Sequence, residues 1–386
     1  MIIRKILLLA AVIAFPFCLW AQETTSEIVG TISDGKTPLI GATVTIVNVS
    51  NGIRSTVVTR REGRYNIPNL QVGGPYSITV SYVGFNKTKR DSVFLLLGQE
   101  FRADFSLRQA NTLKGVTVTS VRQNNVINSN RTGSQEIIGR NQIERLPTIN
   151  RSLQDFTKLT PSSNGLSFGG RNSLYNNVTV DGANFNNVFG LSSTLGGQTN
   201  SQPISIDAIE QIQVSISPFD VRQGGFSGAG LNSVTRSGTN KIKGSVYTYI
   251  RTPGIQGYKV KTVELPQTDF SYNQRGLSVG GPIIENKLFF FVSAEQERVT
   301  APATGLTALR SGQTAVPGSI SQASYDSLIA LRDTLKNRFG YNPGEFEGYN
   351  NRTQSDKITV KIDWNINDNN RLTLKYNYLN RLGMQV

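Results

Sequence analysis

The stretch Lys357–Trp364 reads KITVKIDW and decides the fold, because apolar and polar residues alternate along it. One face of such a strand carries Ile358, Val360, Ile362 and Trp364, and the other carries Lys357, Thr359, Lys361 and Asp363. The stretch Arg371–Tyr378 (RLTLKYNY) repeats the alternation. Strands with one apolar and one charged face are typical of a wall between lipid and a wet lumen.

Five alternating stretches follow residue 240, and long and short connections join them in turn. We expect strands at 241–251, 269–280, 287–298, 356–364 and 370–379. Outer-membrane barrels have long external loops and short periplasmic turns, so 240–386 is predicted to begin a transmembrane β-barrel. Leucines at helical spacing in the longest connection predict a helix at 324–339.

The composition excludes most enzyme classes. The chain has no His, and Cys18 is its one cysteine, so the common general base, thiol nucleophiles and Cys or His metal sites are missing. No carboxylate pair stands out for acid–base work. The net charge of +14 is spread along the chain rather than clustered, which argues against a nucleic-acid partner. We therefore expect no catalytic residues, no cofactor and no metal.

Residues 1–21 have the pattern of a secretory signal. Arg4 and Lys5 precede an apolar run that is too short to span a bilayer comfortably and that Pro16 interrupts. Removal of this signal also removes Cys18. The mature chain is then an exported protein without disulfides.

Residues 26–107 contain short strands separated by turn residues. The strands are expected at 28–32, 38–46, 55–59, 63–67, 76–82 and 101–107. This spacing predicts a small β-sandwich.

A linker at 111–130 follows, with one stretch of high β-propensity, LKGVTVT at Leu113–Thr119. It is either a last strand of the sandwich or a strand that adds to the sheet edge of another protein. Its spacing favours neither reading. The residues at issue are Leu113, Val116, Thr117, Val118 and Thr119.

Residues 133–238 form a second unit with a mixed α/β pattern. Short helices are expected at 140–147 and 151–159, the second capped by Asn150. Glycine-rich turns and short strands occupy the remainder.

Several motifs in these segments resemble known families. The sandwich resembles the carboxypeptidase regulatory-like domain, a transthyretin-like fold, at Val29–Ile32, Pro38–Val44 and Gly63–Tyr65. Arg60 departs from that pattern, in which Asp usually precedes the Gly-x-Tyr turn. The similarity is to the accessory domain and not to a peptidase, whose zinc site needs His.

The whole mature chain resembles the TonB-dependent outer-membrane receptors, in particular the OmpA-related subgroup with an N-terminal regulatory-like domain. The strongest motifs are Ile143–Pro147, Gly169–Ser173, Val180–Gly182, Phe226–Asn232 and Thr235–Gly238. The resemblance implies a plug domain at 133–238 and makes 113–119 a TonB box, the strand that the energy-coupling protein pulls. The implied plug motif comprises Gly169, Gly170, Arg171, Asn172, Val180, Asp181, Gly182, Glu210, Gly228, Asn232 and Thr235.

The resemblance implies a transporter in the bacterial outer membrane, with the sandwich in the periplasm. Its partners would be TonB, outer-membrane lipid and an unidentified solute, for which carbohydrates and peptides are candidates. Ser215–Asp220 departs from the siderophore-receptor pattern, so siderophore specificity is not implied. The alternative is a surface adhesion or secretion scaffold without transport. Because closed barrels need at least about 8 strands, we expect a fragment or a truncated product.

Overall fold

The computed structural model describes residues 24–110, 117–120, 135–186, 201–216, 224, 226–257, 259–260, 263–264, 269–302, 306–316, 320–368 and 370–385. The fold is mainly β, as the sequence predicts. Contacts divide the described chain into two units. Unit 1 takes residues from 24–50, 54–186 and 209–235, and unit 2 takes those from 51–53, 201–208 and 236–385.

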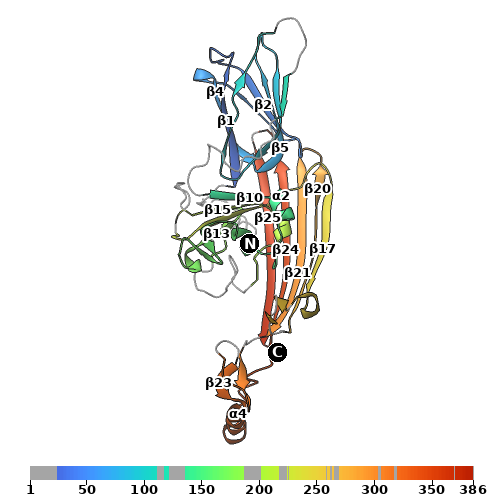
Figure 1. Ribbon diagram of the computed structural model, residues 1–386. Helices are drawn as coiled ribbons and strands as arrows, with labels where there is room; N and C mark the ends of the chain where they lie inside the picture. Colours follow the sequence, from blue (N-terminus) through green and yellow to red (C-terminus); the bar gives the residue numbers. More distant parts are fainter. Residues whose placement is uncertain are drawn as a thin grey trace, which may run out of the picture. The chain divides into compact units, whose positions relative to one another are not determined.

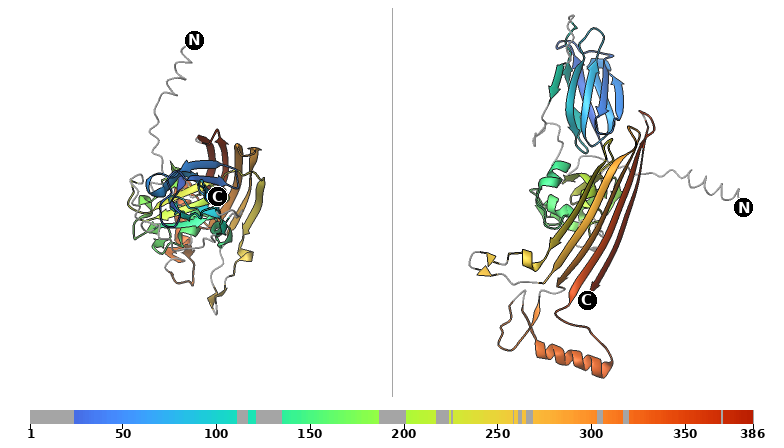
Figure 2. Two further views of the ribbon diagram at one scale, coloured as in Figure 1. Left: turned by 90° about the horizontal axis from the view of Figure 1, so that it is seen from above. Right: turned by 90° about the vertical axis from the view of Figure 1, so that its right-hand side faces the viewer.

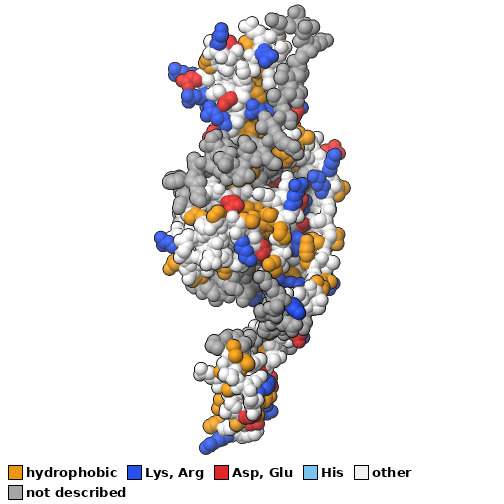
Figure 3. Space-filling model, in the orientation of Figure 1, with side chains coloured by type: hydrophobic (Ala, Val, Ile, Leu, Met, Phe, Trp, Pro, Cys, Tyr) orange, Lys and Arg blue, Asp and Glu red, His pale blue; other side chains and the backbone are white. Residues whose placement is uncertain are grey.

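The sandwich in unit 1 consists of two sheets around an apolar core. One sheet has the order β4 (Arg64–Gln71), β1 (Thr25–Ser33) and β7 (Glu100–Arg102), with β8 (Phe105–Ser106) also on β1. The other has the order β3 (Arg54–Val58), β2 (Thr43–Asn48), β5 (Gly73–Ser81), β6 (Thr88–Leu95) and β9 (Thr117–Ser120). Charged side chains of both signs lie on the outer surface of the sandwich (Figure 3).

The predicted sandwich is present, with two differences from the expected strands. The strand expected at 38–46 begins only at Thr43, because Gly41 takes a positive φ of 82° and the chain turns there. Strand β6 was not predicted. Its first five residues, TKRDS, are polar and show no alternation of apolar and polar side chains. Only Val93 and Leu95, near its end, are buried in the core.

The second part of unit 1 has a mixed α/β fold. Its sheet has the order β10 (Gln135–Gly139), β15 (Ile209–Ser215), β16 (Gly230–Thr235), β13 (Asn177–Val180) and β14 (Ala183–Asn184). Helices α2 (Arg140–Arg145) and α3 (Leu153–Thr157), the pair β11 (Ser163–Asn164) and β12 (Ser167–Phe168), and the short helix η2 (Ser173–Tyr175) accompany it.

The predicted cap of α3 is wrong by two residues. Ser152 is the N-cap, and its hydroxyl accepts a hydrogen bond from the Asp155 backbone N–H. Asn150 lies two residues before Ser152 and donates its backbone N–H to the Asp155 carboxylate at 2.9 Å. Ser and Asn cap helices equally well, so composition alone does not choose between them.

Unit 2 is built on one antiparallel sheet, which we call the wall sheet. Its strands follow in chain order, as β17 (Lys243–Arg251), β20 (Ser271–Ile284), β21 (Leu288–Pro302), β24 (Asn350–Asn365) and β25 (Arg371–Gln385). They run side by side as the long yellow to red arrows of Figure 1. All five predicted strands are therefore confirmed, and the last four extend further than predicted.

The long connection between β21 and β24 is itself folded. It holds the parallel pair β22 (Thr307–Leu309) and β23 (Ile320–Ser324), followed by α4 (Tyr325–Phe339), which confirms the predicted helix. This part lies beyond one end of the long strands (Figures 1 and 2). An ion pair between Arg310 and Glu347 joins its two ends, and a second one links Arg332 of α4 to Glu345. Among the described helices, none has the length and apolar character to cross a bilayer.

Candidate functional site

The two faces of the wall sheet differ in chemistry. One face leaves apolar side chains exposed, among them Val246 at 88%, Leu374 at 66% and Leu372 at 52%. The opposite face buries polar side chains, among them Gln274, Ser278, Ser293, Glu295, Ser355, Lys357, Thr359 and Lys361. The alternation read from KITVKIDW is thus confirmed, with Lys357 buried and Ile358 exposed.

A buried ion cluster lies at the centre of the polar face. The Lys357 ammonium donates to Glu295 Oε1 at 2.7 Å and to Glu297 Oε2 at 3.1 Å. Glu295 and Lys357 are direct neighbours across β21 and β24, so the strand register brings the charges together. Because unpaired buried charges are strongly unfavourable, the Lys357 ammonium stabilises the fold by compensating the charge of the buried Glu295 carboxylate.

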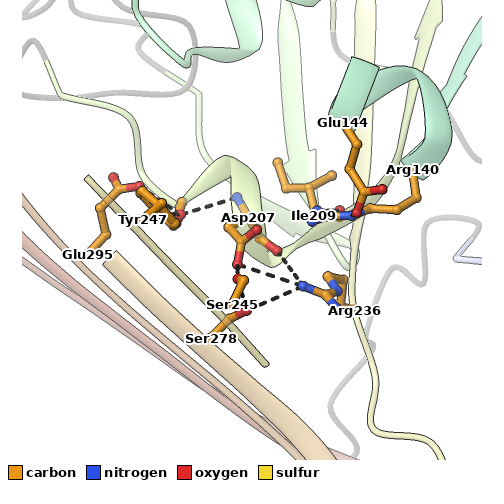
Figure 4. Close-up of polar contacts among 10 residues, drawn as sticks. Arg140, Glu144, Asp207, Ile209, Arg236, Ser245, Tyr247, Ser278 and Glu295 are labelled. Atoms are coloured by element: carbon orange, nitrogen blue, oxygen red, sulfur yellow. Dashed lines mark hydrogen bonds and ion pairs between the residues drawn. The ribbon is translucent and has the colours of Figure 1, made fainter. Parts of the chain in front are cut away.

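Residues Ser201–Ala208, which we call the latch segment, are held on this polar face. The segment ends in the short helix η3 (Ile206–Ala208). Ser205 Oγ donates to Glu295 Oε2 at 2.7 Å, and the Tyr247 hydroxyl donates to the same oxygen at 2.7 Å (Figure 4). Ser201 Oγ donates to Ser355 Oγ at 2.9 Å. Neutral hydroxyl groups therefore bind the segment to carboxylates that the sheet's own lysine neutralises.

Asp207 makes the second attachment of the latch segment. Ser245 Oγ donates to Asp207 Oδ2 at 2.8 Å, and Arg236 lies 3.7 Å from the same carboxylate (Figure 4). The Arg236 backbone N–H donates to the Ala208 carbonyl at 2.8 Å, and its guanidinium stacks over the Phe291 ring. Ser278 accepts from Arg236 at 3.4 Å. The chain entering β15 and the chain leaving β16 are thus joined to each other and to the wall sheet.

In unit 1 the predicted Val180–Gly182 motif forms a tight hairpin turn. Asp181 and Gly182 have φ values of 47° and 83°, which a two-residue turn between β13 and β14 requires. The Asp181 carboxylate accepts from the Thr235 backbone N–H at 2.8 Å and from its hydroxyl. Asn232 accepts from the Thr179 hydroxyl at 3.0 Å. The structure therefore brings Val180, Asp181, Gly182, Asn232 and Thr235 together.

The remaining predicted plug residues lie elsewhere in unit 1. Gly169, Gly170, Arg171 and Asn172 form an exposed turn, in which Asn172 Oδ1 caps η2 by accepting the Leu174 N–H at 3.0 Å. Gly228 packs so closely that a Cβ would lie 2.3 Å from Asn176 Oδ1. Glu210 occupies a register shift between β15 and β16. These residues do not converge on one pocket and have structural environments of their own.

Near the start of β15, α2 is attached to the sheet. Arg140 donates from Nε to Glu144 at 2.7 Å and from its guanidinium to the Ile209 carbonyl at 3.1 Å (Figure 4). This contact explains part of the Ile143–Pro147 motif, because Glu144 orients the arginine.

Two glutamines of β15 bind the sandwich within unit 1. Gln211 accepts from the Leu97 backbone N–H at 3.0 Å and donates to the Leu95 carbonyl at 2.9 Å. Gln213 donates to the Leu97 carbonyl at 3.4 Å. Val72, Leu97 and Val234 form an apolar cluster at the same junction. The sandwich therefore has a specific, buried attachment to the mixed α/β sheet.

The predicted TonB-box stretch is described in part. Thr117, Val118 and Thr119 lie in β9, which pairs in parallel with β6, whereas Leu113 and Val116 lie outside the described residues. For residues 117–120, the structure therefore shows the first of the two alternatives, a strand of the sandwich. Its role in energy coupling stays a prediction.

Sequence reasoning did not find the latch segment, Gln211 or Gln213. Serine and glutamine in short, buried segments carry no distinctive pattern, and their partners are as far as 154 residues away in the chain. The one sequence feature that pointed to the buried polar face was Lys357, on the charged side of KITVKIDW. No group of three His, Cys, Asp or Glu residues suited to a metal occurs in the part of the chain that the structure describes.

Comparison with known proteins identifies two domain families. Residues 27–108 match the carboxypeptidase regulatory-like domain, and residues 234–342 match an outer membrane beta barrel domain. The chain is 28% identical over 302 residues to the TonB-dependent transporter Oar of Myxococcus xanthus, which covers 73% of this chain and 27% of that protein. These matches confirm the resemblance to TonB-dependent outer-membrane proteins and a location in the outer membrane.

The solved structures that match part of this chain include a siderophore receptor and an outer membrane transporter. The siderophore receptor PirA from Acinetobacter baumannii matches 65% of this chain and 32% of its own, with 18% identity and a TM-score of 0.43. The outer membrane transporter YddB from Escherichia coli matches 64% of this chain and 33% of its own, with 17% identity and a TM-score of 0.40. The chain spans about a quarter of the length of the curated relative and a third of these structures.

Proposed function

We propose that this chain is part of a TonB-dependent outer-membrane transporter that takes up a solute through a plug-gated barrel. The observation that carries the proposal is the latch segment on the polar face of a sheet whose other face is apolar. A sheet of this kind suits a lumen wall, and a segment bound inside it suits a plug. Comparison with Oar supports TonB-dependent transport as the class of activity.

The proposed energy source lies outside the chain. TonB would pair with residues 113–119, which we call the coupling strand, and would pull on it with work taken from the inner-membrane proton gradient. Force would then pass along the chain to β10, the first strand of the mixed α/β sheet. This mechanism needs no nucleotide, metal or catalytic side chain in the chain itself.

The proposed solute is a carbohydrate or a peptide. Two exposed regions are candidates for its first contacts, the turn at Gly169–Asn172 and the folded connection from 306 to 349. The connection carries exposed Phe339 and Tyr341, which suit stacking on a sugar or an aromatic side chain. The turn offers the exposed Arg171 and Asn172.

The test is a proline in the coupling strand of the full-length gene. Val118→Pro removes a backbone donor and prevents regular strand pairing, so uptake of the solute should be lost while the protein still reaches the outer membrane. Gln123→Pro, five residues further on, is the matched control and should transport normally. Uptake by Val118→Pro at the level of the control would reject energy coupling through this strand.

The second candidate function is a surface adhesion or secretion scaffold. The observation that favours it is the secondary structure between β21 and β24, which comprises the pair β22–β23, helix α4 and two ion pairs and offers a surface to a partner. Deletion of 306–349 would separate the two functions. Normal growth on every solute combined with altered attachment or protein export would favour the scaffold.

A further inference from the structure

The outer edge of β6 is occupied by the chain's own coupling strand. Residues 117–120 pair with β6 in parallel, in the register Thr88 with Thr117, Lys89 with Val118, Arg90 with Thr119 and Asp91 with Ser120. Strand β6 would otherwise be the last strand of its sheet, because β5 lies on its other side. An unpaired edge of this kind is a ready template for an extended peptide.

We propose that this edge, Thr88–Asp91, is a docking surface for the coupling strand and that the strand must leave it before transport can occur. The inference rests on the proposed function, since it assigns a resting position to the segment that TonB is proposed to pull. The surface is defined by backbone hydrogen-bonding groups, which suit an extended segment, and residues 117–120 of this chain occupy it. In this account the sandwich holds the coupling strand at rest.

The geometry of β6 limits the docking surface to a few residues. Ser92 has a positive φ of 61°, and the pairing of β5 with β6 changes register between Tyr76 and Ile78. A bulge of this kind bends the strand and interrupts the regular edge. The docking surface therefore ends at Asp91, and it pairs with three residues of the coupling strand, Thr117–Thr119, and with Ser120 directly after them. Parallel pairs are also slightly less stable per residue than antiparallel ones, which favours a strand that can be released.

The docking surface at Thr88–Asp91 is placed so that it can restrain the coupling strand. While residues 117–120 are paired with β6, a pull on the coupling strand is borne by the sandwich. The sandwich is in turn attached to β15 through Gln211 and Gln213. Force reaches β10 along residues 121–134 only after the strand separates from β6.

The experiment uses a reversible cross-link in the full-length protein. Residues 22–386 contain no cysteine, so an introduced pair has no competing thiol in this part of the chain. Neighbouring strands lie about 4.8 Å apart, within the Cα range that a disulfide accepts. The test pair is Asp91→Cys with Ser120→Cys. The control pair is Thr56→Cys with Ser120→Cys, because Thr56 lies on β3 at the opposite edge of the same sheet.

We expect oxidation of resting cells to cross-link the test pair and not the control pair. Solute uptake by the oxidised test protein should be lost relative to the same protein after reduction, and a reductant should restore it. If the test pair does not reach the membrane, Thr88→Cys with Thr117→Cys repeats the comparison at the other end of the docking surface.

Two results would overturn the inference. One is cross-linking of the test pair no greater than that of the control pair, and the other is equal uptake by the oxidised and reduced forms. Failure of the proposed function is distinguishable, because Val118→Pro would then transport normally whether or not the cross-link forms.

Discussion

The sandwich and the wall sheet are both made of alternating β-strands, yet they bury opposite kinds of side chain. The sandwich encloses Ile28, Ile78 and Val80 at 0% exposure and keeps its charged residues outside. The wall sheet encloses Lys357 and Glu295, each at 4%, and leaves Leu374 exposed at 66%. The same sequence period therefore serves two arrangements, an apolar core with a charged surface in the sandwich and a polar buried face with an apolar exposed face in the wall sheet.

The largest expected effect comes from the buried cation of the wall sheet. Lys357→Met leaves Glu295 buried without its counter-ion, which should lower the free energy of unfolding by about 3–5 kcal/mol. Lys89→Met in the sandwich removes an exposed partner of Asp91 and should change it by less than about 1 kcal/mol. Denaturant midpoints of the full-length protein in detergent measure both. Equal midpoint shifts for the two variants would contradict the contrast.

The second largest effect is expected from a charge introduced on the exposed face of the wall sheet. Leu374→Arg should destabilise the membrane-inserted protein by about 2–4 kcal/mol, because the arginine would face hydrocarbon. Val58→Arg is the matched change on the sandwich, where a side chain of 58% exposure faces water, and should stay within about 0.5 kcal/mol. Unfolding in lipid vesicles gives both values. If Leu374→Arg does not lower the stability, the exposed face contacts water and not hydrocarbon.

A buried polar contact in unit 1 shows that burial of polar groups is not confined to the wall sheet. Gln211→Ala leaves the Leu95 carbonyl and the Leu97 N–H without their partner, and should cost about 1–3 kcal/mol. Gln154→Ala, on the half-buried surface of α3, serves as control. Hydrogen exchange at Leu97 should accelerate only in the first variant. Unchanged protection would mean that the sandwich does not depend on this contact.

The smallest expected effect is a pH dependence of the sandwich. Burial alone would raise the pKa of Asp104, but hydrogen bonds from Arg102 and Thr31 outweigh it and hold the pKa below its ordinary value. A lowered folded-state pKa means that this carboxylate stabilises the fold above the unfolded-state pKa and loses that effect as the pH falls toward the folded-state value.

Thr31→Val should therefore raise the pKa of Asp104 and weaken the fold slightly at neutral pH. Carbonyl NMR titration of residues 24–110, whose core is complete within 28–107, measures the change. Thr45→Val on β2 is the control. The same Asp104 titration in both variants would exclude the Thr31 contact as a cause.

The sequence predicts the wall sheet better than any other part because its alternation is local and strong. KITVKIDW shows both faces directly, and the structure confirms them. Strand β6 escaped prediction since its first five residues are polar, and β9 remained open because spacing alone does not identify a strand's partner. The latch contacts could not be predicted, because Ser205 and Glu295 lie 90 residues apart and a serine has no pattern of its own.

Spin labels along β25 test most directly whether the exposed face of the wall sheet contacts hydrocarbon. Nitroxides would replace residues 372–377 one at a time in the full-length protein inserted in vesicles. Labels at 372, 374 and 376 should be accessible to oxygen and protected from a water-soluble nickel chelate, with the reverse at 373, 375 and 377. Equal nickel accessibility at 372, 374 and 376 would show that this face lies in water and would contradict the account.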